Sequence, residues 1–413
     1  MSDSISPIDG IGQSNNQANR YLWIALSVVF STVVAQSLIS QGLPVLYPFI
    51  QNEFGLSRAQ VGLMTSSYAI GFGATVGLAG WLTDSFGVKR IITISLLGVT
   101  AFTLAFPLAL SFSFILALAI LIGIAASPLY PATTRAVMDW FPARIRAFAM
   151  SLKQTGFPIG GALTAIVFPT IAVLIGWRVA AAVTGLLVLV IAIMFMLLYR
   201  DTPRDREAPH KFNFTNLQTI LRNRPLMTSI IWGTTISGLR YVTLTYIMLF
   251  LIEELGHSTI MAGGMLAVAQ ISSIIARVLW GAASDFVFHR RRIPVLAIIG
   301  FITVIWMLGA SLISPEVPVP IIYLIVALIG ISTLSYPGVL TTLLGEQAET
   351  GQVGVTVGLS SMLNHVTQIL MPPLFGYLVD ISSSYSLGWR TAAAIVLVCT
   401  LALLAFGREP QRR

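Results

Sequence analysis

The sequence predicts an all-α membrane protein of twelve transmembrane helices, arranged as two pseudo-symmetric six-helix bundles. Three observations predict this class. The 413 residues are 56% hydrophobic and only 10% charged, with a mean hydropathy of +0.85. A water-soluble domain carries about a quarter charged residues, so the outer surface of this chain must contact lipid. Twelve apolar segments are long enough to cross a bilayer, and short motifs recur in the two halves of the sequence.

The spans follow from length, because a membrane-crossing helix needs about 20 mostly apolar residues. Gly and Pro recur inside them, which membrane helices tolerate. From the N-terminus, the predicted helices are 22–50, 59–83, 91–108, 113–138, 147–175, 177–199, 226–252, 259–284, 292–313, 320–343, 353–379 and 388–406.

The connections between spans predict the domain organisation. Most are a few residues long, whereas 200–225 is a long, polar and charged break after the sixth helix. We therefore expect five parts, which are a disordered cytoplasmic tail over 1–21, an N-terminal six-helix bundle over 22–199, a cytoplasmic linker over 200–225, a C-terminal six-helix bundle over 226–406 and a cytoplasmic tail over 407–413.

The basic residues predict the orientation in the membrane. Of the 24 Lys and Arg residues, 17 lie in the tails and in the connections that share their side. Three lie on the other side, namely Arg58, Arg178 and Arg390. Because cytoplasmic loops carry the excess of Lys and Arg, we expect a multi-pass protein of the cell (inner) membrane with both termini in the cytoplasm.

The two halves of the sequence repeat. The stretch GWLTDSFGVKR begins at Gly80, and a degenerate copy, GAASDFVFHRRR, begins at Gly281. The dipeptide that starts at Tyr130 recurs at Tyr336. The offsets, 201 and 206 residues, nearly agree. An internal repeat of this kind is typical of transporters whose solute path runs between two related bundles.

The first copy resembles the signature of the loop between helices two and three in the major facilitator superfamily, G-x-L-x-D-x-x-G-x-[RK]-[RK]. The resemblance implies that these loops control conformational change. The candidate gating residues are Gly80, Asp84, Gly87, Lys89 and Arg90 in the first copy, and Gly281, Asp285 and Arg291 in the second. A carboxylate such as Asp84 can satisfy the N-terminus of a helix from the other half. The alternative is that these charges only anchor a tight cytoplasmic turn.

Two further stretches resemble the organic-anion symporter branch of that superfamily. The segment 130–142, YPATTRAVMDWFP, has a Pro, an Arg and a Trp-Phe-Pro at the spacing of helix four in that branch. Arg277, Trp280 and Asp285 are similar to the end of helix eight in several anion carriers. In those carriers the Arg reaches the substrate.

Charges inside the predicted spans indicate the solute. Four cations remain there, namely Arg135, Lys153, Arg240 and Arg277, and no carboxylate lies deep in a helix. A buried cation costs at least ~2.5–3.5 kcal/mol and is kept where it has a partner or a function. The simplest partner is an anionic solute, which Arg binds as a two-pronged fork and Lys as a point charge.

Each cation also has a structural interpretation that involves no solute. Arg135 is four residues before Asp139 and can pair with it. Lys153 can extend to the membrane surface. Arg277 can pair with Asp285 or Glu346, whereas Arg240 lies too deep in its helix to reach the surface.

Neutral polar residues in the spans complete the candidate substrate-binding set. They are Gln36, Gln154, Gln270, Asn364 and His365. Such residues more often form hydrogen bonds between helices. His365, the one His inside a predicted span, can also carry a coupling proton, because His titrates near neutral pH.

We therefore expect a secondary active transporter of a small organic anion, with a carboxylate favoured, that works by alternating access. Proton-coupled uptake and anion exchange both stay open. A drug or lipid exporter of the same fold is an alternative, as is a membrane receptor or sensor. We expect no enzyme activity, cofactor, metal site or nucleic-acid partner, and a monomer in the lipid bilayer.

Overall fold

The computed structural model describes residues 8–202, 220–348 and 352–409, which are helices and the turns that join them. Most of the predicted linker therefore lies outside the described residues. The N-terminal bundle consists of α1 (Ile8–Ser40), α2 (Gly42–Phe54), α3 (Arg58–Phe86), α4 (Val88–Ala105), η1 (Phe106–Leu108), α5 (Phe112–Ala126), α6 (Leu129–Trp140), α7 (Ala143–Leu174) and α8 (Trp177–Leu198).

The C-terminal bundle follows residue 219. It consists of α10 (Arg224–Leu249), η2 (Phe250–Glu254), α11 (Thr259–Ala282), η3 (Ala283–Val287), α12 (Ile293–Leu312), α13 (Val319–Ile331), α14 (Pro337–Gln347), α15 (Val353–Ser382) and α16 (Tyr385–Phe406). The elements η2 and η3 are π-helical continuations of α10 and α11.

These helices make twelve spans. Within the described residues, ten helical stretches are long and apolar enough to cross a membrane. The eleventh span is α15, which has 30 residues but carries polar side chains in its first half. The remaining span, which is the tenth along the chain, is the pair α13–α14, because neither helix is long enough alone. The predicted fold class is confirmed.

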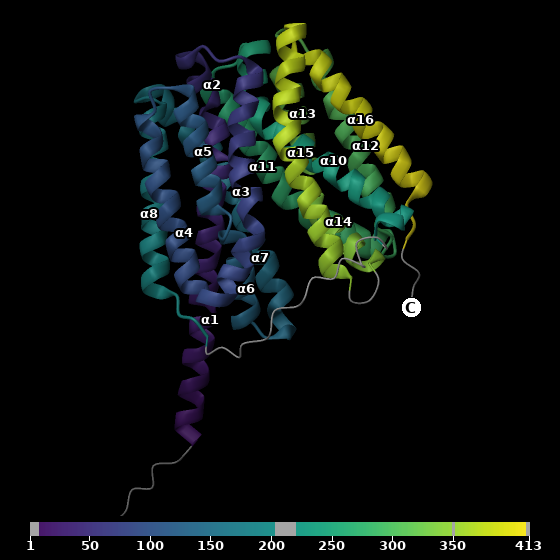
Figure 1. The fold of residues 1–413 in the computed structure, drawn as a ribbon. Coiled ribbons are helices and arrows are strands. Elements are labelled where there is room, and N and C mark those ends of the chain that lie inside the picture. Colours follow the sequence, from purple (N-terminus) through teal and green to yellow (C-terminus); the bar gives the residue numbers. More distant parts are fainter. Residues whose placement is uncertain (1–7, 203–219, 349–351, 410–413) are drawn as a thin grey trace, which may run out of the picture.

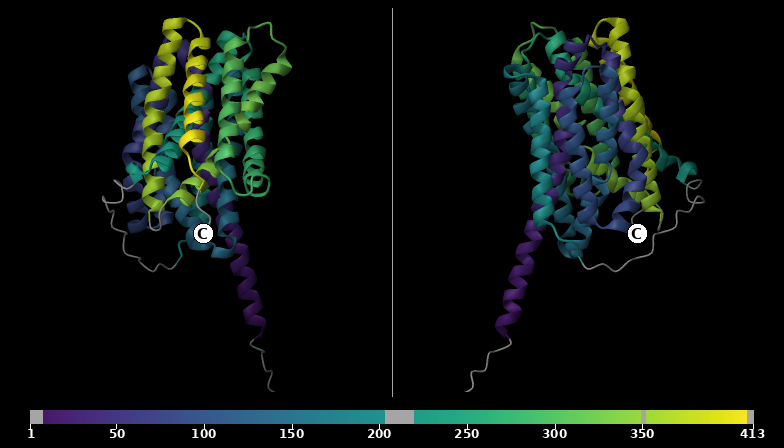
Figure 2. Two further views of the ribbon diagram at one scale, coloured as in Figure 1. Left: turned by 90° about the vertical axis from the view of Figure 1, so that its right-hand side faces the viewer. Right: turned by 60° about the vertical axis from the view of Figure 1, so that its left-hand side comes forward.

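The first helix begins earlier than predicted. We expected a disordered tail over 1–21, but α1 starts at Ile8 and projects beyond the bundles (Figure 1, Figure 2). Once a helix exists, each added residue gains a backbone hydrogen bond for the loss of only its own freedom. The polar residues 8–20 therefore continue the apolar helix that follows them.

Three spans that hydropathy predicts as continuous are broken. The first breaks between Ser40 and Gly42, the fourth at Ser127 and Pro128, and the tenth at 332–336. At two of these breaks, side chains of a neighbouring helix form hydrogen bonds with the broken span. Thr75 on α3 and Ser127 share a hydrogen bond of 2.8 Å between their hydroxyl groups. Donors on α11 bond the tenth span at Ile331 and Leu334.

The two bundles contact one another mainly through α3 with α15 and α7 with α11, and α10 also contacts α2 and α3. In Figure 1 the ribbons converge at the end where α2 lies and diverge toward the end that carries the C-terminus. We call these the closed end and the terminal end. The closed end contains the start of α3 and the end of α15, whose residues bond one another across the bundles.

At the terminal end, each bundle has an equivalent helix-capping contact of its own. Asp201, after α8, accepts a 2.9 Å hydrogen bond from the backbone N–H of Lys89 at the start of α4. Glu409, after α16, accepts bonds of 3.1 and 2.8 Å from the backbone of Arg292 and Ile293 at the start of α12. A carboxylate at this position satisfies unpaired N–H groups and the helix dipole. The repeat therefore extends beyond the motifs visible in the sequence.

Close packing inside the N-terminal bundle predicts a sensitive glycine. A Cβ atom at Gly123 of α5 would overlap the backbone of α3 at Tyr68 and Phe72. Because backbone atoms cannot rotate away, we expect Gly123→Val to cost about 1–3 kcal/mol of stability, as overpacked cores do. Thermal denaturation in detergent measures this loss. Gly264→Val is the control, since no atom lies within 4 Å of that site, and equal denaturation temperatures for the two variants would contradict the packing argument.

Candidate solute-binding site

The candidate site lies where α7 of the N-terminal bundle meets α10 of the C-terminal bundle. Lys153 and Phe157 lie four residues apart on α7, so they share one face of that helix. The ring of Phe157 lies 5.3 Å from the guanidinium carbon of Arg240 on α10. Arg240 is half-buried, and its Nε atom is buried without a hydrogen-bond partner. The arginine is therefore supported by an aromatic face, with donor capacity to spare.

A second arginine lies close to the first. Arg277 on α11 donates a 2.9 Å hydrogen bond from Nη2 to the carbonyl oxygen of Leu334, in the break of the tenth span. Its Nε atom is also buried without a partner. The positive charges of Arg240 and Arg277 lie close enough to repel one another, and Tyr336 lies near both. Two like charges in one place favour the binding of an anion.

Lys153 is the third cation, and it is almost fully buried, with 1% of its surface exposed. Its Nζ atom donates a 2.8 Å hydrogen bond to the hydroxyl of Thr134 on α6. The same atom lies 5.5 Å from the centre of the Tyr130 ring. A hydroxyl and an aromatic face stabilise the ammonium group but do not neutralise its charge.

The structure distinguishes these three cations from the fourth by their ion pairs. Within the described residues, Lys153, Arg240 and Arg277 form no ion pair with a carboxylate. Arg135, by contrast, lies 2.7 Å from Asp139 and 3.8 Å from Asp84. The interpretation of Arg135 as an unpaired cation is therefore wrong, because its neighbour four residues along the helix neutralises it. Arg277 does not use the Asp285 or Glu346 carboxylates that were its alternative partners.

Gln270 connects the two bundles. Its Nε2 atom on α11 donates a 2.6 Å hydrogen bond to Oε1 of Gln41, at the break between α1 and α2. Gln41 in turn donates to Oγ of Ser37 and to the carbonyl oxygen of Phe157, over 2.7 and 2.9 Å. Both glutamines are buried. In this conformation Gln270 therefore makes the interhelical bond that was the alternative to solute binding.

The other predicted polar residues are dispersed. Gln36 is buried on α1, whereas Gln154 is exposed on α7. Asn364 on α15 has a buried Oδ1 atom without a hydrogen-bond partner. His365 lies at the contact between α15 and α3, with its ring 5.4 Å from that of Phe72. Their roles in binding or proton transfer stay predictions.

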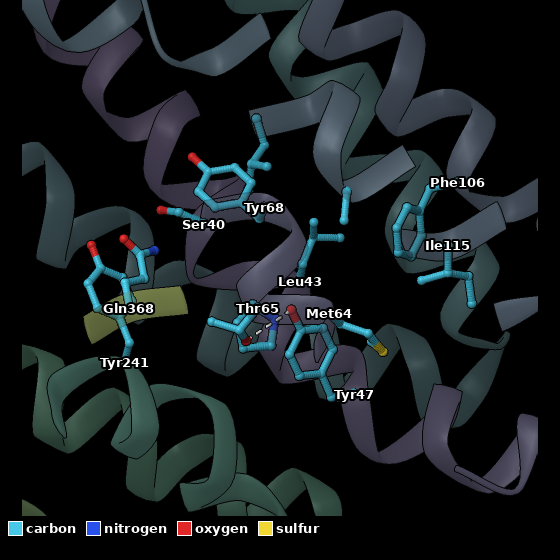
Figure 3. Close-up of a pocket in the computed structure, with 13 residues that line it drawn as sticks. Ser40, Leu43, Tyr47, Met64, Thr65, Tyr68, Phe106, Ile115, Tyr241 and Gln368 are labelled. Carbon is cyan, nitrogen blue, oxygen red and sulfur yellow. Dashed lines mark hydrogen bonds between the residues drawn. The ribbon is translucent and has the colours of Figure 1, made fainter. Parts of the chain in front are cut away.

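A small pocket lies beside the contact between the bundles. It has a volume of about 20 Å³, room for about one water molecule. Most of its lining residues belong to the N-terminal bundle, and Figure 3 shows Tyr241 of α10 and Gln368 of α15 together at one side of them. On its floor, the hydroxyl of Thr65 lies 2.8 Å from that of Thr245, which joins the bundles.

Beyond the pocket, charged residues fasten the closed end. The carboxylate of Asp380, at the end of α15, accepts bonds of 3.0 and 2.9 Å from the backbone N–H groups of Arg58 and Ala59 at the start of α3. The guanidinium of Arg58 lies 2.9 Å from Glu253. The hydroxyl of Tyr246 lies 2.7 Å from the Arg58 carbonyl oxygen. We call Arg58, Glu253 and Asp380 the outer latch.

The two predicted gating carboxylates each pair with an arginine of their own bundle. Asp84 pairs with Arg135 of the same bundle at 3.8 Å. Asp285 pairs with Arg292 at 2.5 Å, and it is Arg292, not the exposed Arg291, that also pairs with Glu346. Gly87 has φ +90°, which favours glycine.

The remaining candidates at the terminal end lie apart from other helices. A Cβ atom at Gly80 or Gly281 would meet no atom within 4 Å. Lys89 and Arg90 line an open hollow with Asp201. Their gating role stays a prediction.

Comparison with known proteins assigns the family. The sequence profile of the Major Facilitator Superfamily matches residues 28–365. The chain belongs to this superfamily. The hexuronate transporter of Bacillus subtilis is 25% identical over 397 residues, which is 92% of this chain and 93% of the relative. A probable sulfoacetate transporter of Cupriavidus necator is 25% identical over 394 residues, 88% of each chain.

A solved structure confirms the major facilitator fold. A bacterial homologue of the human lysosomal transporter Spinster, in an inward-facing and occupied conformation, superimposes with a TM-score of 0.74 at 17% identity. The match covers 94% of this chain and 95% of that one. The predicted resemblance to this superfamily is therefore confirmed, and the two relatives described above are named as transporters of organic acids.

Sequence reasoning missed the outer latch of this major facilitator protein. Asp380 and Glu253 look like ordinary charges at span ends, because nothing local connects them with Arg58. One signal was available. Few charged residues lie on the predicted outer side, and these three lie beside spans that belong to different halves.

The contacts of the outer latch predict how the fraction of molecules that are open at the closed end changes when one contact is removed. Asp380→Ala removes a helix cap between bundles, a loss of about 1–2 kcal/mol that would raise the open fraction about 5- to 30-fold. A Ser66→Cys reporter detects opening by maleimide labelling, because Ser66 is buried there against Ile369. The background carries Cys399→Ser, which removes the one native cysteine.

The matched control for Asp380→Ala is Asp201→Ala, which removes a helix cap within one bundle. We expect faster labelling in the Asp380→Ala variant and an unchanged labelling rate in the Asp201→Ala variant. The same labelling rate in Asp380→Ala and in the reporter without it would show that the latch does not hold the closed end.

Proposed function

We propose that this protein is a secondary active transporter of a small organic anion, with a carboxylate as the recognised group. One observation carries the proposal, namely that Lys153, Arg240 and Arg277 have no carboxylate partner among the described residues. Burial of a cation in a membrane protein is costly unless a partner compensates it. An acid that enters between the bundles supplies that partner, and a guanidinium group binds a carboxylate through two parallel hydrogen bonds.

The relatives support the same class of solute. A hexuronate and sulfoacetate differ in size and share an acidic group, and the named relatives transport them. Arg240 and Arg277 together suit one acidic group, since a fork of donors matches carboxylate and sulfonate oxygens alike. We therefore expect the transported acids to include short carboxylates and sulfonates as well as sugar acids.

We propose further that transport proceeds by alternating access. The structure is fastened at the closed end, through the outer latch and the bond between Thr65 and Thr245. At the terminal end, a Cβ atom added to Gly77 of α3 or Gly358 of α15 would meet no atom within 4 Å. At the closed end the same two helices do approach closely, at Gly62 and Gly376. Glycines at both ends of one helix pair suit a rocking motion in which each end closes in turn.

The basic residues predict which side of the membrane each end of the protein faces. With both termini in the cytoplasm, as the positive-inside rule favours, the closed end faces outward and the observed conformation faces inward. Inward movement of a monoanion against about 100 mV costs ~2.3 kcal/mol. Proton cotransport or exchange for an internal anion offsets that cost, and both belong to the proposal.

The first test is uptake of labelled D-glucuronate, acetate and a neutral hexose into proteoliposomes. Arg240→Gln removes charge-assisted hydrogen bonds worth about 1.5–3 kcal/mol each, so we expect KM for a transported acid to rise about 10- to 100-fold. Arg178→Gln is the control, because Arg178 pairs with Glu53 outside the candidate site, at 2.6 Å.

Three outcomes decide between the options. Uptake of the hexose but of no acid would refute the anion proposal. Stimulation by an inward proton gradient would identify proton coupling, whereas stimulation by an internal acid without a gradient would identify exchange.

The second test concerns alternating access. Gly358→Leu adds bulk where the terminal ends must meet, so we expect transport to stop while the inward-facing form keeps its thermal stability. The control is Gly264→Leu, which also meets open space but lies near the closed end of α11. Normal transport by the Gly358→Leu variant would contradict a closure of α3 on α15.

A further inference from the structure

Arg240 differs from the other two cations in what supports it. Its guanidinium carbon lies 5.3 Å from the Phe157 ring and 5.7 Å from the ring of Tyr241. Lys153 and Arg277 each donate a hydrogen bond to an oxygen atom. The Nε atom of Arg240 is buried and has no such partner. Aromatic rings are therefore the main support of this charge among the described residues.

An aromatic support has a specific advantage at a binding site. The ring face attracts a cation through its quadrupole, and it leaves the N–H groups of a guanidinium free to donate. A carboxylate in the same place would neutralise the charge and compete with an anionic solute. Phe157 can therefore hold Arg240 in one orientation without reducing its capacity to bind an acid.

The backbone of Phe157 is itself fixed. Its carbonyl oxygen accepts hydrogen bonds from Oγ of Ser37 at 2.5 Å and from Nε2 of Gln41 at 2.9 Å. Gln41 also accepts the 2.6 Å bond from Gln270 of the opposite bundle. A Cβ atom at Gly161 would lie 2.8 Å from Gln270, so α7 fits closely around this contact. Phe157 is thus held at the point where the bundles are bonded together.

We propose that Phe157 is a positioning residue. From the N-terminal bundle, its ring orients the guanidinium of Arg240, in the C-terminal bundle, so that the guanidinium can bind the anion. The inference rests on the proposed function, because it takes Arg240 as a group that binds the solute. It adds that affinity for the acid depends on a side chain of α7 that carries no charge. The arginine is then in its binding orientation when α7 and α10 are packed as observed.

The test compares substitutions that keep or remove the ring. A partly buried cation–π contact corresponds to about a tenfold change in affinity, so we expect Phe157→Leu to raise KM for D-glucuronate, or for the acid that the wild type transports best, about tenfold. The value of kcat should change less than about twofold, since the other groups stay in place. Phe157→Tyr keeps the ring and should restore the wild-type KM.

Controls separate positioning from packing. Phe168→Leu removes a buried ring from the same helix, where it packs against Gly42, and should lower thermal stability without raising KM. Phe157→Met retains apolar volume without a ring and should match Phe157→Leu. If Phe157→Leu fails to fold, Phe157→Met carries the comparison.

A wild-type KM in the ringless variants, or a tenfold rise in Phe157→Tyr as well, would overturn the inference. A wild-type protein that moves no acid would instead refute the proposed function, which distinguishes the two failures.

Discussion

Uncompensated positive charge at the contact between the bundles is the constraint on which the rest of the site depends. A cation there is away from bulk water, and removal of its hydration is costly. The protein does not supply a carboxylate for Lys153, Arg240 or Arg277 among the described residues. It supplies hydroxyl groups, a carbonyl oxygen and ring faces, which stabilise a cation without neutralising it. The remaining attraction is available to an anion.

The same kind of bond closes the molecule at one end and stabilises it at the other. Asp201 and Glu409 each cap a helix of their own bundle, and Asp380 caps α3 of the other bundle. A carboxylate at a helix N-terminus satisfies donors that otherwise bond only water. Within a bundle that contact is part of the fold. Between bundles, water can replace it at modest cost, so the contact suits the opening and closing that we propose.

Hydropathy, charge distribution and the repeat predicted the fold, because each reports on the lipid or on the chain's own symmetry. They did not predict the breaks at Gln41 and at 332–336, since a broken helix keeps its apolar composition. Subtraction of the loop charges left four cations, and the structure gives Lys153, Arg240 and Arg277 no carboxylate partner among the described residues. It failed for Arg135, whose partner lies one helical turn away. Asp380 and Phe157 were missed because their contacts join α15 to α3 and α7 to α10, which no local pattern shows.

The charge balance also bears on how the proposed alternating-access cycle would be driven. An empty carrier that reorients must enclose its cations without a partner, whereas a loaded carrier encloses them with an acid. The loaded crossing therefore has the lower free-energy cost, which favours exchange of one anion for another. In the proposed cycle, loss of positive charge from the empty site would lower the cost of its return during net uptake. Arginine does not deprotonate in proteins, but a buried lysine can. Of the three cations, Lys153 is thus the one whose deprotonation would lower the cost of an empty return, and it does so without any carboxylate in the site.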